Sequence, residues 1–295
     1  MVETKVNKNS TAWYIGWALI IVGAVFAGAQ AMKDNGPSIE WRRVVMDGHR
    51  AGAQPVTADN VSEALGTFTE EGYMCPSGVC YMDDLPVALE AAELLEVQPK
   101  LAHLKTVIGH SAGMYMNLRT QPDLPLGNLV ADVFRAFGSR YFGVPMDFAV
   151  TNYGGIRTPM PAGAVTLEDI TSMFPFNNYL CYAQLRGASL TKLLEQLAGT
   201  KAFQAVSGCE VRTKGGKLVS ATVGGAAIDP ERLYNVTTID FLLDGGDKLN
   251  IGALAEKVEL THVLLREVML DYVRSCEAAG KEIVAASDGR VIMEE

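Results

Sequence analysis

Residues 151–157 have the sequence Thr151-Asn152-Tyr153-Gly154-Gly155-Ile156-Arg157. The preceding residues, 147–151, predict a buried strand, which would run into this polar, glycine-rich turn. The Asn152 amide offers both a donor and an acceptor, which suits a base edge or a ribose hydroxyl. Gly154 and Gly155 let the backbone approach a ligand closely, and Arg157 offers a planar fork for phosphate. Taken alone, however, the turn is more typical of a hairpin with a surface arginine.

Two later segments favour a ligand site. Phe176 follows a predicted helix in a loop, and Phe241 leaves a predicted strand in a segment that ends in a Gly-Gly turn and Asp247. Two loop aromatics can sandwich a planar base, and such stacking contributes about 1–3 kcal/mol per base. A carboxylate at a fixed offset can accept hydrogen bonds from ribose hydroxyls. The alternative is that both phenylalanines are core residues, the commoner outcome for a single phenylalanine.

Six segments, taken in order, resemble the C-terminal domain of 5′-nucleotidases. They are residues 126–132 (LGNLVAD), 152–157, 175–176, 184–187, 203–208 and 241–247. Tyr153 stands where the family pattern has a first glycine. The resemblance covers roughly residues 105–255, and its ordered motifs make it specific. The chain also resembles stand-alone versions of this domain in Bacteroidetes-type bacteria.

The resemblance implies a role for each matching position. Asn152 would contact the base, with Gly154 and Gly155 beside it. Phe176 and Phe241 would stack on its two faces. The remaining expected contacts are Asp247 to the ribose, Arg157 to ribose or phosphate, and Arg119, which lies one residue away from the usual place of a further family arginine.

The fold expected from this resemblance is a layered α+β domain with mixed sheets. We expect a signal peptide or membrane anchor over residues 1–32, a strand and helical lead-in over 33–104, and the nucleotide-recognition domain over 105–295. Hydrophobic periodicity predicts helices over residues 59–71, 84–105, 126–137, 167–173, 188–198 and 257–279. Strands are expected at 106–109, 147–151, 179–185, 208–213, 217–223, 234–239 and near 283.

The N-terminus indicates export. Lys5 and Lys8 precede an uncharged apolar run over residues 12–29, which is followed by small-x-small cleavage patterns. Its length, about 18 residues, lies between a signal-peptide core and a full membrane span. We therefore expect the chain in the periplasm or on the outer face of the cytoplasmic membrane, with cleavage or retention as an anchor left open. A buried soluble helix is the alternative.

Charge and cysteine content limit the remaining classes of function. The net charge of −9 argues against broad nucleic-acid binding, which needs a basic face. Five cysteines are too few for a disulfide scaffold. Cys75 and Cys80 could close a small loop in an oxidising compartment, or remain reduced thiols in a mobile loop.

A competing motif is Gly109-His110-Ser111-Ala112-Gly113, which fits the nucleophile elbow of serine hydrolases. A triad would need a later histidine on a loop, and the only one downstream, His262, falls within a predicted helix. Because the motif fits but the loop histidine is not predicted, a serine hydrolase using Ser111 is kept only as an alternative function.

A binuclear metal centre is not predicted. Asp47-Gly48-His49 has the D-x-H form with which metallophosphatases begin, but four histidines in all are too few for such a centre. The sequence thus predicts a nucleotide- or nucleoside-recognition component of a 5′-nucleotidase, without catalytic residues or cofactor of its own. Its expected partner is a separate metallophosphatase polypeptide that carries divalent metals. A binding-only nucleoside scavenger is a further alternative.

Overall fold

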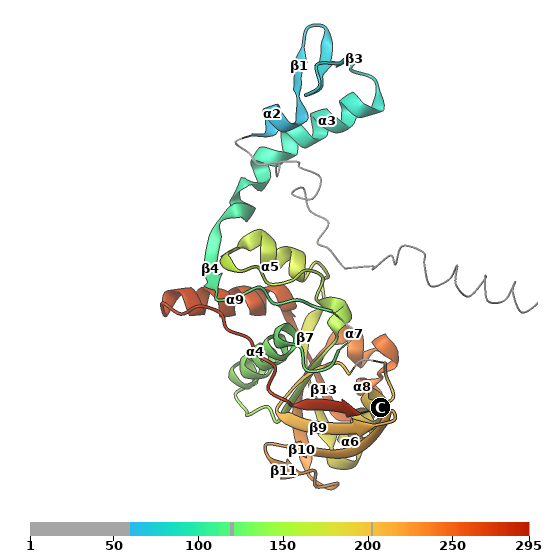
Figure 1. Ribbon diagram of the computed structural model, residues 1–295. Helices are drawn as coiled ribbons and strands as arrows, with labels where there is room; N and C mark the ends of the chain where they lie inside the picture. Colours follow the sequence, from blue (N-terminus) through green and yellow to red (C-terminus); the bar gives the residue numbers. More distant parts are fainter. Residues whose placement is uncertain (1–59, 119–120, 202, 295) are drawn as a thin grey trace, which may run out of the picture. The chain divides into compact units, whose positions relative to one another are not determined.

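The computed structural model describes residues 60–118, 121–201 and 203–294 (Figure 1). They form an α+β fold with mixed sheets and belong to one compact unit, Val56–Glu295. The expected signal or anchor over residues 1–32, most of the lead-in up to residue 59, and Arg119 lie outside the described residues. Within the described ranges, no helix combines the length and the apolar character needed to cross a membrane.

The central element is a five-stranded sheet with the order β13-β7-β12-β5-β8. Its strands are β5 (Phe148–Thr151), β7 (Tyr179–Arg186), β8 (Ala205–Ser207), β12 (Leu233–Ile239) and β13 (Ala255–Leu264). The strands β5 and β12 are parallel, and the other neighbouring pairs are antiparallel. The predicted strands at 147–151, 179–185 and 234–239 are therefore confirmed.

The register of this sheet brings four loops to one edge. Because β5 and β12 are parallel, their carboxyl ends lie side by side. Leu180, at the start of β7, is opposite Ile239, at the end of β12. Ala205, at the start of β8, is opposite Thr151, at the end of β5. The loops after β5 and β12 and those before β7 and β8 therefore converge.

A second sheet has the order β11-β10-β9-β14, and a separate pair joins β4 to β6. Their strands are β4 (Val107–Ser111), β6 (Gly163–Thr166), β9 (Cys209–Lys214), β10 (Lys217–Val223), β11 (Ala226–Ala227) and β14 (Val291–Glu294). The terminal strand predicted near residue 283 was misplaced. Ile283 forms only an isolated bridge to Ser111, whereas Val291–Glu294 pairs in parallel with β9.

One buried arginine ties β14 to the domain. Arg290, with a side chain only 12% exposed, donates to both carboxylate oxygens of Asp132 at 2.8 and 3.0 Å. It also donates to the Val206 carbonyl at 3.0 Å. Burial alone would lower the pKa of Arg290, but the hydrogen bonds to Asp288 and Asp132 outweigh it and raise that pKa. The guanidinium therefore stays charged and holds the segment before β14 against a helix.

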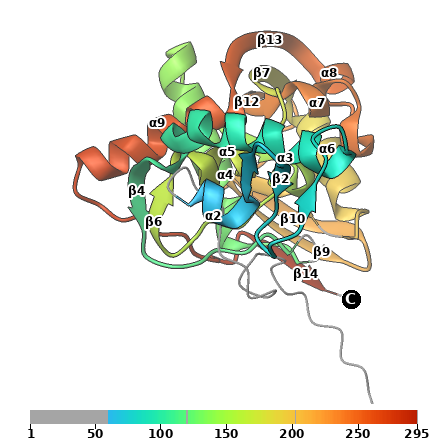
Figure 2. The ribbon, with the colours of Figure 1, turned by 90° about the horizontal axis from the view of Figure 1, so that it is seen from above.

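The helices of the domain are α4 (Pro125–Phe142), α5 (Leu167–Met173), α6 (Gly187–Ala198), α7 (Asp240–Leu243), α8 (Ile251–Leu254) and α9 (Leu265–Ala278). The helix α4 packs on β5, β8 and β12, and α6 packs on β7 and β10 (Figure 1). Both views place α7 and α8 side by side close to β12 and β13 (Figure 2). The predicted helices at 167–173 and 188–198 are confirmed, and α4 extends beyond 126–137 at both ends.

The helix predicted over residues 257–279 was wrong at its start, residues 257–264. These residues belong to β13, which pairs with β7 so that Val258 is opposite Ala183 and Leu260 is opposite Cys181. Local periodicity does not show that β7 has a free edge whose backbone groups need partners. His262 consequently lies on a strand, with its ring edge-on to Tyr179 at a centroid distance of 6.1 Å.

The described lead-in is less helical than predicted. It contains α2 (Val61–Leu65), β1 (Thr67–Thr69), β2 (Gly72–Met74), β3 (Cys80–Tyr81), α3 (Pro86–Val97) and the 3₁₀ segment η2 (Gln98–Lys105). Gly66, with φ of +88°, ends the first helix and starts a hairpin where a longer helix and a loop were expected. Pro99 lacks a backbone N–H, and the α-helical geometry of α3 ends just before it.

Cys75 and Cys80 are both free thiols. Cys80 is paired with Met74 across β2 and β3, so Cys75, one residue further, belongs to the opposite face of the hairpin. The Cys75 thiol lies 3.0 Å from the Ser77 hydroxyl, and the Cys80 thiol donates to the Glu71 carbonyl at 3.4 Å. The reduced alternative is the one that the structure contains.

Candidate functional site

The loops that converge at the edge of the central sheet enclose a cavity of about 290 Å³. It is lined by Asn152, Gly154, Gly155, Phe176, Asn178, Phe241 and Asp247. This volume is at the lower end for small-molecule sites, about 300–1,000 Å³. Every predicted ligand-binding residue that the structure describes lines this cavity, except Arg157.

The two phenylalanines present apolar faces to solvent. Phe176 is 48% exposed and Phe241 is 42% exposed, whereas Phe174, two residues earlier, is 3% exposed and belongs to the core. The alternative that both are core residues is therefore wrong for this pair. An exposed aromatic costs hydration free energy, which contact with a planar ligand would recover.

Asp247 and Asn152 form a polar wall of the cavity, and Gln204 contacts Asp247 from outside it. Asp247 Oδ2 accepts hydrogen bonds from Asn152 Nδ2 at 2.9 Å and from Gln204 Nε2 at 3.1 Å. An ionised carboxylate only accepts, so this contact fixes which atom of the Asn152 amide is nitrogen. Asn152 Oδ1 is then buried without a partner among the described residues. A buried acceptor of this kind is unfavourable unless a donor reaches it, and a ligand N–H or O–H would supply one.

The turn that carries Asp247 is strained. Asp247 has φ of 51° and Lys248 has φ of 65°, both in the left-handed region that non-glycine residues rarely adopt. The preceding Gly246 is required by packing, because a Cβ there would lie 2.4 Å from Phe241 Cε1. This glycine lets the turn close against the Phe241 ring. Such strain is concentrated at functional sites, where surrounding contacts hold it in place.

The two glycines after Tyr153 make room for Asn152. A Cβ would lie 3.1 Å from Asn152 Nδ2 at Gly154, and 2.8 Å from Oδ1 at Gly155. Glycine was expected here because it lets the backbone approach a ligand closely. The structure adds a second reason, which is that a side chain at either position would crowd the Asn152 amide. Substituting Gly155 would press directly on the unpaired oxygen.

Tyr153 occupies its unusual place because Gly127 leaves space for its ring. A Cβ at Gly127 would lie 2.3 Å from Tyr153 Cε1, so the glycine of the LGNL segment accommodates the tyrosine. The Tyr153 hydroxyl accepts from the Leu124 N–H at 3.4 Å, and burial raises the pKa of Tyr153 to about 12. The tyrosine is therefore a packing residue that supports the loop.

Arg157 contributes less than expected to the cavity. The Arg157 guanidinium lies 5.7 Å from the centroid of the Phe176 ring and donates to the Gly154 carbonyl at 3.3 Å. It is exposed and lies against the aromatic wall, without lining the cavity. Arg119 lies outside the described residues.

The sequence interpretation missed Asn178 and Gln204. Asn178 lines the cavity just before β7. Gln204, just before β8, accepts from the Tyr153 N–H at 3.0 Å and thereby links the 152–157 turn to Asp247. Gln204 lies within the 203–208 motif and Asn178 lies two residues after the 175–176 motif. Their shared signal is a polar side chain immediately before a strand that starts at the ligand edge.

The comparison with known families agrees with this geometry. Residues 106–255 match the family described as "5'-nucleotidase, C-terminal domain". The chain belongs to this family. The match spans the sheet strands β5, β7, β8 and β12 and all the loops that line the cavity.

Relatives of this 5′-nucleotidase C-terminal domain include longer bacterial proteins. Protein UshA of Yersinia enterocolitica is 31% identical over 105 residues, covering 34% of this chain and 19% of UshA. The cell wall protein Lmo0130 of Listeria monocytogenes is 28% identical over 183 residues, covering 57% of this chain and 23% of Lmo0130. The chain spans about a fifth of the length of these curated relatives.

Among solved structures, the 5′-nucleotidase precursor of Thermus thermophilus has a similar fold. Its TM-score is 0.62 at 25% identity, with 76% of this chain and 45% of the Thermus chain covered. The fold expected from the sequence motifs is therefore confirmed for the described domain.

Ser111, in the nucleophile-elbow motif, does not form a catalytic triad with His110 or His262 in this 5′-nucleotidase C-terminal domain. Ser111 is 2% exposed, and its hydroxyl donates to the Gly113 carbonyl at 2.9 Å. His110 is paired with Glu277 at 3.0 Å, and the ring of His262 is packed against Tyr179. Strand β4 pairs with β6, so the motif forms part of a sheet where a hydrolase would have an exposed turn.

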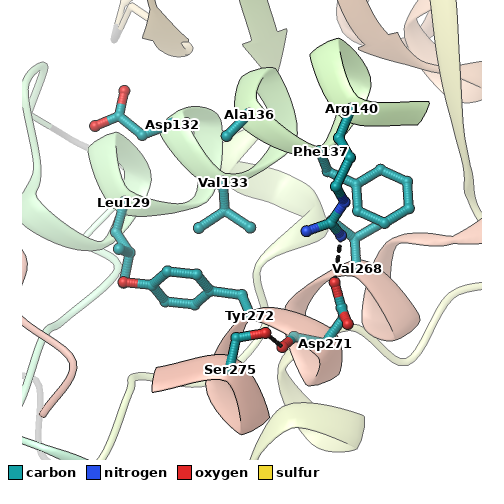
Figure 3. Close-up of a pocket in the computed structure, with 10 residues that line it drawn as sticks. All are labelled: Leu129, Asp132, Val133, Ala136, Phe137, Arg140, Val268, Asp271, Tyr272 and Ser275. Atoms are coloured by element: carbon teal, nitrogen blue, oxygen red, sulfur yellow. Dashed lines mark hydrogen bonds and ion pairs between the residues drawn. The ribbon is translucent and has the colours of Figure 1, made fainter. Parts of the chain in front are cut away.

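A separate hollow, of about 400 Å³, lies between α4 and α9 (Figure 3) and is distinct from the cavity at the sheet edge. Its apolar floor includes Val133 and Tyr272, and the Arg140–Asp271 ion pair crosses it. None of the predicted binding residues lines it. Within residues 60–118, 121–201 and 203–294, no group of three His, Cys, Asp or Glu side chains is placed to hold a metal ion.

Proposed function

We propose that this chain recognises a nucleoside or nucleotide as a component of a 5′-nucleotidase system for phosphate or nucleoside scavenging. The observation that carries the proposal is the cavity in which two half-exposed phenylalanines flank the Asn152–Asp247 pair. An apolar slot with a few convergent polar groups suits a planar base attached to a polyhydroxylated sugar. Membership of the 5′-nucleotidase C-terminal domain family supports it.

Each wall of the cavity has a distinct task in this proposal. Phe176 and Phe241 stack on the base, and Asn152 Oδ1 accepts a hydrogen bond from it. Both amides that reach Asp247 use Oδ2, so Oδ1 remains open to accept from ribose hydroxyls. Arg157, beside Phe176, is placed to meet ligand charge at the mouth of the cavity.

The test is calorimetric titration of adenosine into the purified chain. We expect saturable binding that weakens about tenfold or more in Asp247→Asn, because hydrogen bonds to charged groups contribute about 1.5–3 kcal/mol. Asp244→Asn is the matched control, since Asp244 is an exposed acid of the same turn that does not line the cavity. Absence of adenosine binding by the folded chain would refute the proposal.

We further propose that the hydrolytic step is supplied by a separate metallophosphatase polypeptide with divalent metals. The expected result is no phosphate release from 5′-AMP by this chain with divalent metal, and activity when that polypeptide is added. This activity should fall in Asp247→Asn, because substrate presentation is lost. Metal-dependent turnover by the chain alone would contradict the division of labour. If the metallophosphatase releases phosphate from 5′-AMP at the same rate with and without this chain, the chain would instead be a binding-only nucleoside scavenger.

We also propose export to the periplasm or the outer face of the cytoplasmic membrane, with anchoring through residues 12–29 if the segment is retained. The charge-flanked apolar run supports this location, as does the relative Lmo0130, which is named a cell wall protein. Fractionation with N-terminal sequencing tests it. A cytoplasmic chain that starts at Met1 would exclude it.

A further inference from the structure

A second hollow adjoins the proposed base cavity. It has a volume of about 400 Å³ and is lined by Tyr153, Gly154, Thr200, Lys201, Gln204, Asp247 and Lys248. Gly154 and Asp247 line both spaces, so the two hollows are neighbours that share these residues as a common wall. A ligand held at Asp247 would therefore have the second hollow next to it.

Two lysines give this hollow a positive character in a chain of net charge −9. Lys201 lies shortly before β8 and Lys248 follows β12, so the converging loops of the central sheet bring both cations together. Both are exposed, and neither forms an ion pair with any residue in the described ranges. The Asp247 carboxylate is engaged with two amides at Oδ2 and leaves both ammonium groups available.

One of these cations follows Asp247 directly in the chain. The backbone of Lys248, like that of Asp247, has a positive φ angle, which is unfavourable for a residue other than glycine. Asp247 and Lys248 both line this hollow. A carboxylate that accepts from hydroxyls is thus followed immediately by a cation.

We propose that the second hollow binds a phosphate carried on the 3′ oxygen of the ribose. The inference rests on the proposed function, in which Asp247 accepts from the ribose hydroxyls. A phosphate esterified to one of these oxygens would lie on the hydroxyl side of the sugar, where Lys201 and Lys248 line the wall. Ammonium groups are compact point charges suited to a phosphate dianion. Arg157, at the Phe176 wall, does not line this hollow.

The experiment compares adenosine, 3′-AMP and 5′-AMP by calorimetric titration, at one fixed ionic strength because charge pairs are screened by salt. We expect 3′-AMP to bind the wild-type chain more tightly than adenosine. The affinity ratio of 3′-AMP to adenosine should fall about fivefold in Lys201→Gln and in Lys248→Gln, as for partly exposed charge pairs. Using the ratio cancels any general effect on the fold. Lys192→Gln removes the same charge from an exposed position of α6 outside both cavities and should leave the ratio unchanged.

The outcomes separate this inference from the proposed function. The phosphate subsite is refuted if adenosine binds but 3′-AMP binds no more tightly than adenosine. It is also refuted if the affinity ratio of 3′-AMP to adenosine is unchanged in Lys201→Gln and Lys248→Gln. In both cases nucleoside recognition stands. Lysine-dependent tightening of 5′-AMP in place of 3′-AMP would also overturn the assignment. Lysine-dependent binding of 3′-AMP without measurable adenosine binding would support the subsite while refuting recognition of the bare nucleoside. If no ligand binds, both proposals fail.

Discussion

Replacing Phe176 or Phe241 by alanine is expected to weaken adenosine binding by about 1–3 kcal/mol each, the range for a lost stacking face. Both rings are about half exposed in the free chain, so truncation removes ligand contact without opening a core cavity. Calorimetric titration of the two variants and the wild type measures the loss directly. Circular dichroism on the same samples checks that each variant is folded.

A matched control separates stacking from general surface hydrophobicity. Phe68 is 40% exposed and lies on β1, and Phe68→Ala should leave the affinity unchanged. Phe176→Leu is informative as well, because leucine keeps apolar area but lacks the flat face. It should recover only part of the binding lost in Phe176→Ala. Wild-type affinity in both alanine variants, with intact folding, would show that the rings do not contact the ligand.

The second large effect concerns stability. Asp132→Ala is expected to lower the free energy of unfolding by about 2 kcal/mol, because it removes two charge-assisted hydrogen bonds from the partly buried Arg290 guanidinium. The loss stays below that of a fully broken buried pair, since Asp132 is 45% exposed and Asp288 still pairs with Arg290. Urea unfolding followed by circular dichroism measures this change.

The control for this prediction is an ion pair of similar composition at the surface. Arg140 and Asp271 have side chains 66% and 50% exposed, so Asp271→Ala should cost less than about 1 kcal/mol. A double-mutant cycle of Asp132→Ala and Arg290→Met isolates the Asp132–Arg290 interaction, because Asp288 still contacts Arg290 when Asp132 alone is replaced. Equal losses in Asp132→Ala and Asp271→Ala would show that the buried pair has no special weight.

The site was predictable to the extent that its residues lie in recognisable motifs. The structure brings Asn152, Phe176, Phe241 and Asp247 into one cavity, although Phe241, expected in a loop, lies in α7. Lys201, which lines the adjoining hollow, was missed, because its approach to Asp247 depends on the antiparallel pairing of β8 with β5. Such pairing joins segments far apart in sequence and leaves no mark in local periodicity.

The fold errors have the same physical origin. The 257–279 segment has apolar spacing that suits either element at its start, and the free edge of β7 selects the strand. The Ser111 motif was deceptive because five common residues say nothing of burial. Pairing of β4 with β6 and the bridge to Ile283 place that serine inside the structure. Contacts between distant segments determine both the strand at the start of residues 257–279 and the burial of Ser111, and local sequence patterns do not contain them.

The hydrogen bond between Asn152 and Asp247 joins positions 95 residues apart in the chain. The two residues follow β5 and β12, the parallel pair at the heart of the sheet, so the binding wall exists only when these strands are docked. Opening of the sheet and loss of the cavity are therefore one event, and under the proposed function a bound nucleoside would oppose it by mass action. At a ligand concentration of 100 times the dissociation constant, the native state would gain about 2.7 kcal/mol. The stability of the domain would then depend on the nucleoside concentration around it.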